Sequence, residues 1–197
     1  MFLRHSASVI LNRYANVIGI DDAPFDKDRD DKVLIVGAVY SESRLVGVLS
    51  NQVEHDGDDS TTVITAMIRE SRFARQIQAV LLQGIAMAGF NVIDIHALHE
   101  ALSAPVLVIA RHMPDMQAIR NALFSKVKNG QGKWALIEKA GPMQSAEKVY
   151  VQRAGIALTD ARNLIERLAI NGSIPEPLRS AHIIAGGIVR GESRGRT

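Results

Sequence analysis

The chain has 197 residues, of which 47% are hydrophobic and 22% are charged, and its formal net charge at pH 7 is only +2. This length fits a single domain, residues 1–197, that buries roughly 70% of the surface of the unfolded chain. The absence of cysteine excludes disulfides and thiolate chemistry, and no apolar run approaches the roughly 20 residues of a membrane span. Residues 1–13 show no signal-peptide pattern, so we expect a soluble, cytoplasmic protein without a membrane partner.

Charge is unevenly distributed along the chain. Residues 21–31 contain six aspartates and residues 54–59 contain four carboxylates, whereas residues 179–196 contain four arginines and one glutamate. Acidic loops together with a basic C-terminal segment are typical of a metal site beside a phosphate-binding rim. The alternative is that these charge runs are solvated surfaces.

The first predicted element leads into the acidic region. The apolar run Val17–Ile20 predicts a short buried strand whose end presents Asp21, while the adjacent aspartate faces the opposite side. Asp21 then either ligates a metal or caps the turn before Pro24. Residues 32–40 and 44–53 are rich in β-forming residues and flank a polar turn. They predict a hairpin that completes a three-stranded antiparallel meander.

The remaining chain alternates helical and strand patterns. In chain order we expect a helix capped by Ser60 or Thr61, a strand at 79–82, a helix at 95–102, a strand at 105–110, a helix from Asp115 to about Lys126, a loop at 129–132, strands at 134–139 and 149–153, a helix at 158–169 and a last helix within 175–187. This order predicts an α/β domain with a mixed sheet flanked by helices, in which parallel strands follow the antiparallel meander.

Such a sheet brings distant residues to one edge. Asp21, Gln83-Gly84 and the residues after Ala110 follow the carboxyl ends of three predicted strands. Because open α/β sheets bind ligands at the carboxyl ends of their strands, we expect the functional site at this edge.

Several residue types in the chain suit phosphodiester cleavage. Carboxylates that converge on one or two divalent cations, with Mg²⁺ as the natural choice, are the usual requirement. The available carboxylates are Asp21 at a strand end, Asp56, Asp58 and Asp59 before one helix, and Asp94 before another. His182 follows Arg179 by three residues on one helical face, where histidine can transfer a proton and arginine can bind phosphate. A packed, hydrogen-bonded histidine is the structural alternative.

Other kinds of site are not indicated. The chain contains neither a P-loop nor a dinucleotide-binding fingerprint. His96 and His99 have helical spacing but no third ligand nearby, so we interpret them as residues of a surface helix. Phe25, Phe90 and Trp134 are the candidates for base stacking, with core packing as the alternative.

Five motifs occur in a fixed order from about residue 16 to the C-terminus: IGIDDAPF at 18–25, DGDDST at 56–61, LQGI at 82–85 with GFNVID at 89–94, PEPLRSAH at 175–182 and GESRGR at 191–196. Together they resemble the signatures of the archaeal endonuclease dU family, which is similar to endonuclease V. The resemblance implies a ribonuclease H-like fold, dependence on Mg²⁺ (or Mn²⁺), and cleavage of nucleic acid near a deaminated base such as deoxyuridine.

The resemblance also implies roles for particular residues. Asp21 falls at the first metal-ligating aspartate of endonuclease V, and His182 falls at a metal-site histidine. One of the carboxylates in 56–59 would replace a glutamate ligand, and Asp59 is our choice because it lies at a helix start.

Gln83 departs from the endonuclease V pattern, which has aspartate at this position. A glutamine carbonyl can ligate a cation but brings no negative charge, so the metal would be held differently. Asp94, eleven residues further along, is the candidate to supply the missing charge.

The leading hypothesis is a Mg²⁺-dependent endonuclease of DNA repair that acts on deaminated bases, with DNA as its partner and RNA as the alternative polymer. We expect the metal to be bound by Asp21, Asp59, Asp94 and Gln83, and catalysis to be carried by the same three aspartates with His182. We expect nucleic acid to be bound by Arg179, Arg194, Arg196 and Asn91. Asn91 could also complete the metal shell. Two alternatives stay open: a non-catalytic nucleic-acid-binding module with an incomplete metal site, and a phosphohydrolase acting on free nucleotides. No sequence pattern indicates an oligomeric state.

Overall fold

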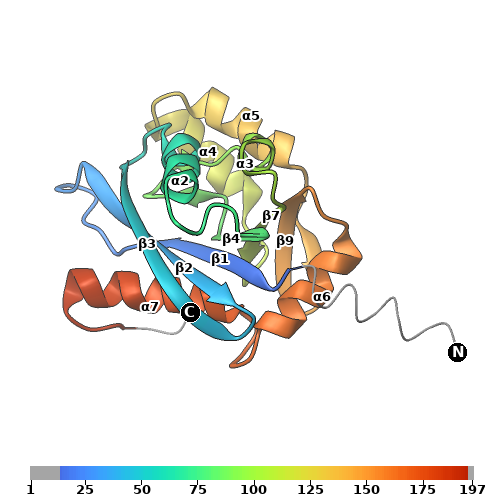
Figure 1. Ribbon diagram of the computed structural model, residues 1–197. Helices are drawn as coiled ribbons and strands as arrows, with labels where there is room; N and C mark the ends of the chain where they lie inside the picture. The colour runs from blue at the N-terminus through green and yellow to red at the C-terminus, as the bar shows by residue number, and fades with distance from the viewer. Residues whose placement is uncertain (1–13, 195–197) are drawn as a thin grey trace, which may run out of the picture.

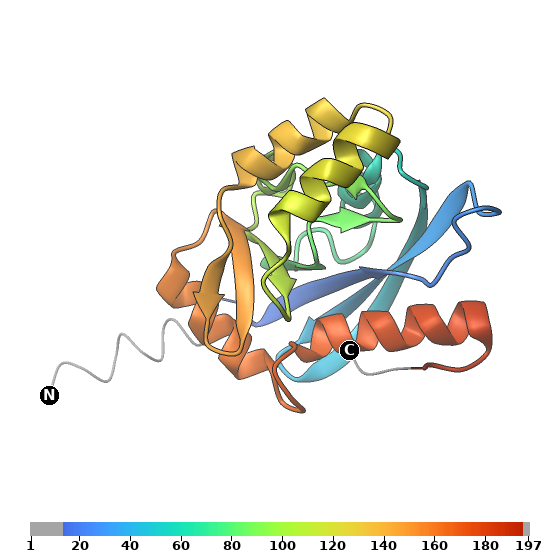
Figure 2. The same ribbon diagram turned by 180° about the vertical axis from the view of Figure 1, so that it is seen from behind.

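The structure is a computed structural model that describes residues 14–194 (Figure 1). The predicted phosphate contact Arg196 and the segment 1–13, for which no signal peptide is predicted, lie outside the described residues. Within residues 14–194, helices cover both faces of a twisted mixed sheet (Figures 1 and 2). This arrangement confirms the predicted α/β class.

The main sheet of the described chain has seven strands in the order β3-β2-β1-β4-β7-β9-β8. Their bounds are β1 Asn16–Asp22, β2 Lys32–Ser41, β3 Arg44–Glu54, β4 Ala79–Gln83, β7 Val106–Ala110, β8 Gln144–Ala146 and β9 Val149–Ala154. The first three strands form the predicted antiparallel meander, and β4 and β7 continue the sheet parallel to β1.

Strand β9 corrects the expectation that the later strands would all run parallel to β1. It is antiparallel both to β7 and to β8. The turn at Glu147, which has a left-handed backbone conformation, folds the chain back so that β9 lies between β7 and β8. The tight turn requires β9 to run antiparallel to β8, and the antiparallel pairing of β9 with β7 leaves β8 in the same direction as β7.

Two pairs of helices enclose the sheet. Helices α2 (Ser60–Arg69) and α3 (Ile95–Leu102) bury their apolar sides against one face, in a core that includes Ile18 and Ile20 of β1. The opposite face is covered by α6 (Leu158–Leu168) and α7 (Glu176–Arg190), as Figure 2 shows from behind. None of the helices within residues 14–194 has the length and apolar character needed to cross a membrane.

A third pair of helices packs on a small hairpin outside the main sheet. Helices α4 (Met116–Lys126) and α5 (Gly130–Ala140) bury apolar side chains together with β5 (Ala86–Met87) and β6 (Asn91–Val92). The cap predicted for α4 is confirmed, because the Asp115 carboxylate accepts a hydrogen bond from the Ala118 amide at 2.9 Å.

Helix α5 corrects the predicted loop at 129–132 and strand at 134–139. Residues 134–137 form a short continuous apolar run followed by two charged residues, a pattern that periodicity alone cannot assign to a strand or to a helix. The buried residues of α5, however, are Gly130, Lys133 and Ile137, whose spacing of three and four is that of a helix. A buried lysine hides this period, because lysine is normally counted with the exposed side.

Candidate active site

The carboxyl ends of β1, β4 and β7 lie at one edge of the sheet. Ile20 pairs with Leu82, so Asp21 lies beside Gln83, and Gln83 in turn pairs with Ile109. This register confirms the predicted common edge. Because paired residues of parallel strands point to the same face, Asp21 and Gln83 both face α7.

Asp21 and His182 are in direct contact at this edge. The side chain of Asp21 is 4% exposed, and its Oδ2 accepts a hydrogen bond from Nδ1 of His182 at 2.8 Å. Its Oδ1 accepts from the Asp22 amide at 3.0 Å. Helix α7 therefore brings His182 from the far end of the chain to Asp21, the arrangement on which the predicted site depends. The catalytic roles of the two residues stay predictions.

Gly19 makes this approach of α7 possible. A Cβ atom at Gly19 would lie 2.5 Å from the backbone nitrogen of Leu178 and 2.6 Å from the backbone oxygen of Pro177. Both positions are main-chain atoms of the first turn of α7, which cannot rotate away as a side chain can. The absence of a side chain at Gly19 thus sets the distance between β1 and α7.

Asp22, which adjoins Asp21, belongs to the site but was not among the predicted site residues. Its side chain points to the other face, where Oδ2 accepts a hydrogen bond from the Ala88 amide at 2.8 Å. Burial, followed by the negative charge of Asp21, raises the pKa of Asp22 to about 6. The side chains of Asp21 and Asp22 point to opposite faces of the sheet. Their charges nevertheless interact, because both carboxylates lie at the end of β1.

The charge of His182 follows from the same contact. The hydrogen bond to the Asp21 carboxylate raises the pKa of His182, against the opposing effect of burial. The charges of Asp21 and Asp22 act in the same upward direction, and Arg190 opposes them. A protonated His182 can both neutralise this acidic edge and donate a proton to an oxygen placed there.

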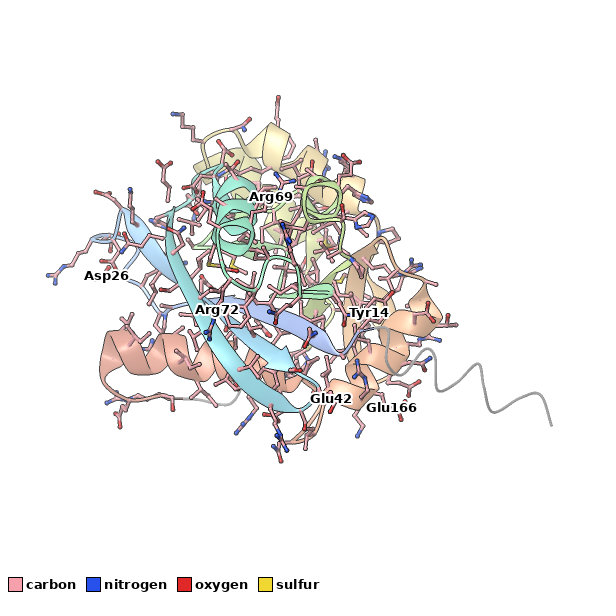
Figure 3. The ribbon with its side chains drawn as sticks, viewed as in Figure 1. Tyr14, Asp26, Glu42, Arg69, Arg72 and Glu166 are labelled. Carbon is pink, nitrogen blue, oxygen red and sulfur yellow. The ribbon has the colours of Figure 1, made fainter. Side chains whose placement is uncertain are left out.

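The first acidic run of the sequence divides into two parts. Asp21 and Asp22 belong to β1, whereas Asp26 lies at the outer end of the connection between β1 and β2 (Figure 3). Asp26 and Asp28 are exposed, and Oδ1 of Asp26 accepts from the Asp28 amide at 3.0 Å. The second part of the run is a solvated turn, which was the alternative considered for it.

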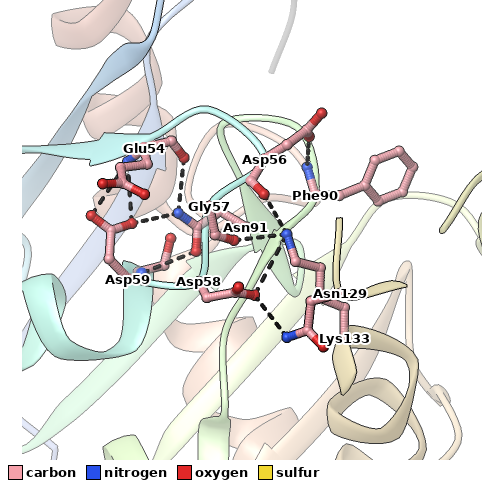
Figure 4. Close-up of polar contacts among 10 residues, drawn as sticks. Glu54, Asp56, Gly57, Asp58, Asp59, Phe90, Asn91, Asn129 and Lys133 are labelled. Atoms are coloured by element: carbon pink, nitrogen blue, oxygen red, sulfur yellow. Dashed lines mark hydrogen bonds and ion pairs between the residues drawn. The ribbon is translucent and has the colours of Figure 1, made fainter. Parts of the chain in front are cut away.

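The structure places Asp59 and Asn91 in a partly buried hydrogen-bond network (Figure 4). Asp59 accepts from the Glu54 amide at 3.1 Å and from Nδ2 of Asn91 at 2.6 Å. Asn91 is 0% exposed, and its Oδ1 accepts from the Ser60 amide at 3.0 Å. These bonds give Asn91 a structural role in the fold, and its contact with nucleic acid stays a prediction. The N-cap residue of α2 is Asp59 rather than Ser60 or Thr61.

Asp94 caps helix α3. Its Oδ1 accepts from the amides of His96 and Ala97 at 3.1 and 3.0 Å, and its Oδ2 accepts from Nζ of Lys139 at 2.7 Å. Burial raises the pKa of Asp94, but the hydrogen bonds from Lys139 and the two amides outweigh burial and leave the pKa lower than usual. These contacts give Asp94 a structural role as the cap of α3.

We expect Asp94→Ala to lower the free energy of unfolding at pH 7 by about 1 kcal/mol, the usual loss for a helix cap. The pKa of Asp94 is lower in the folded chain, so this contribution is present above the unfolded pKa of about 4 and is lost as the pH falls through the folded value. Urea unfolding of both proteins at pH 7 and pH 3 measures the difference, which should shrink at pH 3. Asp94→Asn, which retains a capping oxygen, should be less destabilised; equal loss in both variants would contradict the capping role.

The predicted metal ligands do not form one ready-made set. Among residues 14–194, no three or more histidine, aspartate or glutamate side chains converge closely enough to hold a metal ion. Asp59 and Asp94 are engaged in their own networks, whereas Asp21 has Gln83 and His182 beside it. Any cation at the sheet edge would therefore depend on few protein ligands.

The predicted phosphate contacts differ in their surroundings. Arg179 lies one turn before His182 on α7, and its guanidinium is 3.4 Å from Glu176. Arg194 is exposed and pairs with Glu192 at 2.5 Å. Arg111, which directly follows β7 at the carboxyl edge, was not singled out in the sequence. Its position as the first residue after the predicted strand 105–110 was the feature of the sequence that could have identified Arg111 as a phosphate contact.

A cavity of about 250 Å³ opens just beyond the carboxyl ends of β4 and β7. Its lining is largely apolar and includes Gly84, Phe90, Ala110, Met116 and Gln152. The cavity is smaller than the sites of roughly 300–1,000 Å³ that hold drug-sized ligands. Its size and apolar walls suit a flat group such as a single base.

Comparison with solved structures defines the class of this fold. The catalytic domain of human endonuclease V superimposes with a TM-score of 0.59 and 14% identity over 92% of this chain and 85% of that chain. Endonuclease V from Ciona intestinalis, solved with a DNA that contains inosine, gives a TM-score of 0.55 and 14% identity over 87% and 84%. The fold is thus the ribonuclease H-like fold of endonuclease V, as the resemblance implied.

Closer relatives place the chain in a family. The family model described as endonuclease dU matches residues 13–189, and the chain belongs to the endonuclease dU family. A UPF0215 protein of Deinococcus radiodurans is 46% identical, with 93% of this chain and 94% of the relative aligned. The crystal structure of a protein of unknown function from Archaeoglobus fulgidus has a TM-score of 0.83 and 34% identity over 89% of this chain and 99% of that chain. The family and the fold support a nuclease that acts on nucleic acid.

Proposed function

We propose that this chain is a Mg²⁺-dependent endonuclease that cleaves nucleic acid next to a deaminated base such as deoxyuridine, as a step of DNA repair. The observation that carries the proposal is the contact between buried Asp21 and His182 at the carboxyl edge of the sheet, in a chain of the endonuclease dU family. Many α/β proteins contain scattered carboxylates, but a carboxylate and a histidine joined at this edge suit phosphodiester hydrolysis.

The donors at the edge fit Mg²⁺ in one of its usual modes. Mg²⁺ is commonly held by one or two carboxylates, several waters and the phosphates of the substrate, rather than by a full cage of protein ligands. Asp21 would supply the carboxylate and Gln83 a neutral carbonyl oxygen, on the same face of neighbouring strands. Burial and, after it, the negative charge of Asp21 raise the pKa of Asp22, and a cation beside the two carboxylates would counter the effect of that charge.

With a cation bound at Asp21, the surrounding residues would have separate roles in cleavage. A bound cation supplies Lewis-acid stabilisation of the charge that develops on phosphate. His182, whose pKa is raised by its hydrogen bond to Asp21, donates a proton to the leaving oxygen. Arg111 and Arg179 contact phosphates on either side of the scissile bond, because arginine binds phosphate oxygens in a bidentate manner.

The cavity beyond the ends of β4 and β7 supports the choice of a base as the recognised group. A base that is to be read outside the duplex has to be turned out of the stack and received by a pocket. The apolar walls near Phe90 and Met116 would contact its faces, and main-chain groups near Gly84 would contact its edge. The structural neighbour from Ciona intestinalis was solved with an inosine-containing DNA, and inosine is the product of deaminating adenosine.

Metal removal tests the proposal directly. We expect the purified chain to nick a duplex with one uracil or inosine in millimolar Mg²⁺ or Mn²⁺, and to lose this activity in EDTA until the metal is restored. The same duplex without the deaminated base is the matched control and should stay intact. Equal nicking with and without EDTA would rule out the metal.

A non-catalytic nucleic-acid-binding module is the second candidate. The neutral side chain of Gln83 favours it, because this residue removes a negative charge from the edge. Calorimetric titration with Mn²⁺ separates the two functions. Retained affinity for nucleic acid without metal binding at millimolar concentration would favour the module over the enzyme.

A further inference from the structure

Lys133 of α5 is a buried cation that the proposed chemistry does not use. Its side chain is 1% exposed, and Nζ donates hydrogen bonds to the carbonyl oxygens of Asp56 and, at 2.8 Å, of Gly57 (Figure 4). The one carboxylate that the structure places near Nζ among residues 14–194 belongs to Asp58, at 3.6 Å, and it is largely exposed. Burying an ammonium group is unfavourable unless its hydrogen bonds are made, so Lys133 is tied to the position of these carbonyls.

The turn that Lys133 holds has an unusual backbone. Asp56 has a φ of 51°, in the left-handed region that residues other than glycine rarely adopt. Its amide donates to the Ala88 carbonyl at 2.9 Å, and its Oδ1 accepts from the Phe90 amide at 2.6 Å. Ala88 itself has a φ of 47°. Asp56 and Ala88, both in sparsely populated backbone conformations, are thus hydrogen-bonded to each other. Such conformations persist only where the surrounding structure fixes them.

Gly89 permits this close packing of the two segments. A Cβ atom at Gly89 would collide with Oδ1 of Asp56 and lie 3.2 Å from the ring of His55. The turn at 55–57 and the segment 88–90 therefore form one interlocked unit. Lys133 approaches this unit from α5 and contacts its carbonyl groups.

This unit reaches the candidate active site through Ala88. The Ala88 amide donates to Oδ2 of Asp22 at 2.8 Å, and Asp22 adjoins Asp21. A continuous path of hydrogen bonds consequently runs from Lys133 through Asp56 and Ala88 to the acidic pair at the end of β1.

We propose that Lys133 is a positioning residue of the active site: by holding the carbonyls of Asp56 and Gly57, it sets the place of Ala88 and, through Ala88, of the Asp22 carboxylate beside Asp21. The proposal rests on the proposed function of the same site. Lys133 touches neither substrate nor the reacting atoms in this role. Its effect is on the rate of the chemical step, because small displacements of catalytic groups slow that step strongly.

The test compares Lys133→Met with Lys128→Met. Both variants lose one positive charge, but Lys128 is exposed and lies outside α5. Single-turnover cleavage of a uracil-containing duplex in Mg²⁺ gives the rate at saturation and the half-saturating enzyme concentration separately. For Lys133→Met we expect the rate to fall by about 10- to 100-fold with an unchanged half-saturating concentration. Lys133→Arg should recover part of the rate, and Lys128→Met should match the parent.

Hydrogen exchange provides a readout that does not require activity. We expect Lys133→Met to reduce the protection of the Ala88 amide by roughly tenfold while Val108 in β7 keeps its protection, since only the local unit opens. An unchanged Ala88 amide, an equal loss at Val108, or an unchanged rate at saturation in a parent that cleaves would each overturn the proposal. If the parent protein does not cleave, the proposed function fails. Hydrogen exchange of the Ala88 amide then decides by itself whether Lys133 holds this unit in place. Should Lys133→Met not fold, Lys133→Gln replaces it in both measurements.

Discussion

Replacing Asp21 with asparagine is expected to reduce cleavage of a uracil-containing duplex by about 10³-fold, which corresponds to the several kcal/mol that a cation contributes to such a transition state. Asparagine has nearly the same shape: its carbonyl oxygen can still accept the hydrogen bond from the Asp22 amide, and its NH2 group takes the place of the oxygen that faces Nδ1 of His182. The fold should therefore persist while the negative charge is lost. Cleavage rates in Mg²⁺ measure the effect, and circular dichroism checks the fold.

Asp28→Asn is the control for this prediction. It removes the same charge from the same acidic run, but Asp28 is exposed in the turn between β1 and β2. The control should cleave at the parent rate. If Asp21→Asn also nicks the duplex as fast as the parent, Asp21 has no part in the chemistry and the assignment of the site is wrong.

Gly19→Ala is expected to cause the largest loss of stability, about 3 kcal/mol, the upper end of the usual range for an added methyl group in a packed core. The new methyl group would lie 2.5 Å from the Leu178 nitrogen, so α7 has to move away from β1. This loss should lower the melting temperature by roughly 6–12 °C. It should also slow cleavage, because His182 moves with α7 away from Asp21.

Gly187→Ala is the matched control on the same helix. Apart from the backbone of α7 itself, no atom of residues 14–194 lies within 4 Å of the position that its Cβ would occupy, so alanine fits there without displacing them. Because glycine is unfavourable inside a helix, this change should stabilise the protein by about 0.5–1 kcal/mol. Thermal unfolding of both variants gives the comparison, and a Gly19→Ala protein as stable as Gly187→Ala would contradict the close contact.

Local patterns predicted most of the elements because they are set by neighbouring residues. The strand that ends at Asp21, the meander, and the helix from 95 to 102 all follow from runs of β-forming residues or from helical spacing. The contact between Asp21 and His182 was expected from the resemblance to a family. It could not be derived from spacing, since 161 positions separate the two residues.

The parts that local patterns could not settle depend on tertiary contacts. Helix α5 was taken for a loop and a strand because its inward side includes Lys133, a residue type that a pattern assigns to solvent. Asp59 and Asp94 were taken for metal ligands because carboxylates before helices have the same appearance in either role. Their partners, Asn91 and Lys139, lie 32 and 45 positions away, so the sequence alone could not choose between cap and ligand.

The contact between Asp21 and His182 joins the first strand and the last helix of residues 14–194, so its formation depends on the order of synthesis. The ribosome makes every strand of the main sheet before it makes α7. Because domains fold progressively as the chain emerges, the sheet can form while His182 is still missing from its place beside Asp21. The edge at Asp21 would then be completed only after α7 has been synthesised and has docked against Gly19.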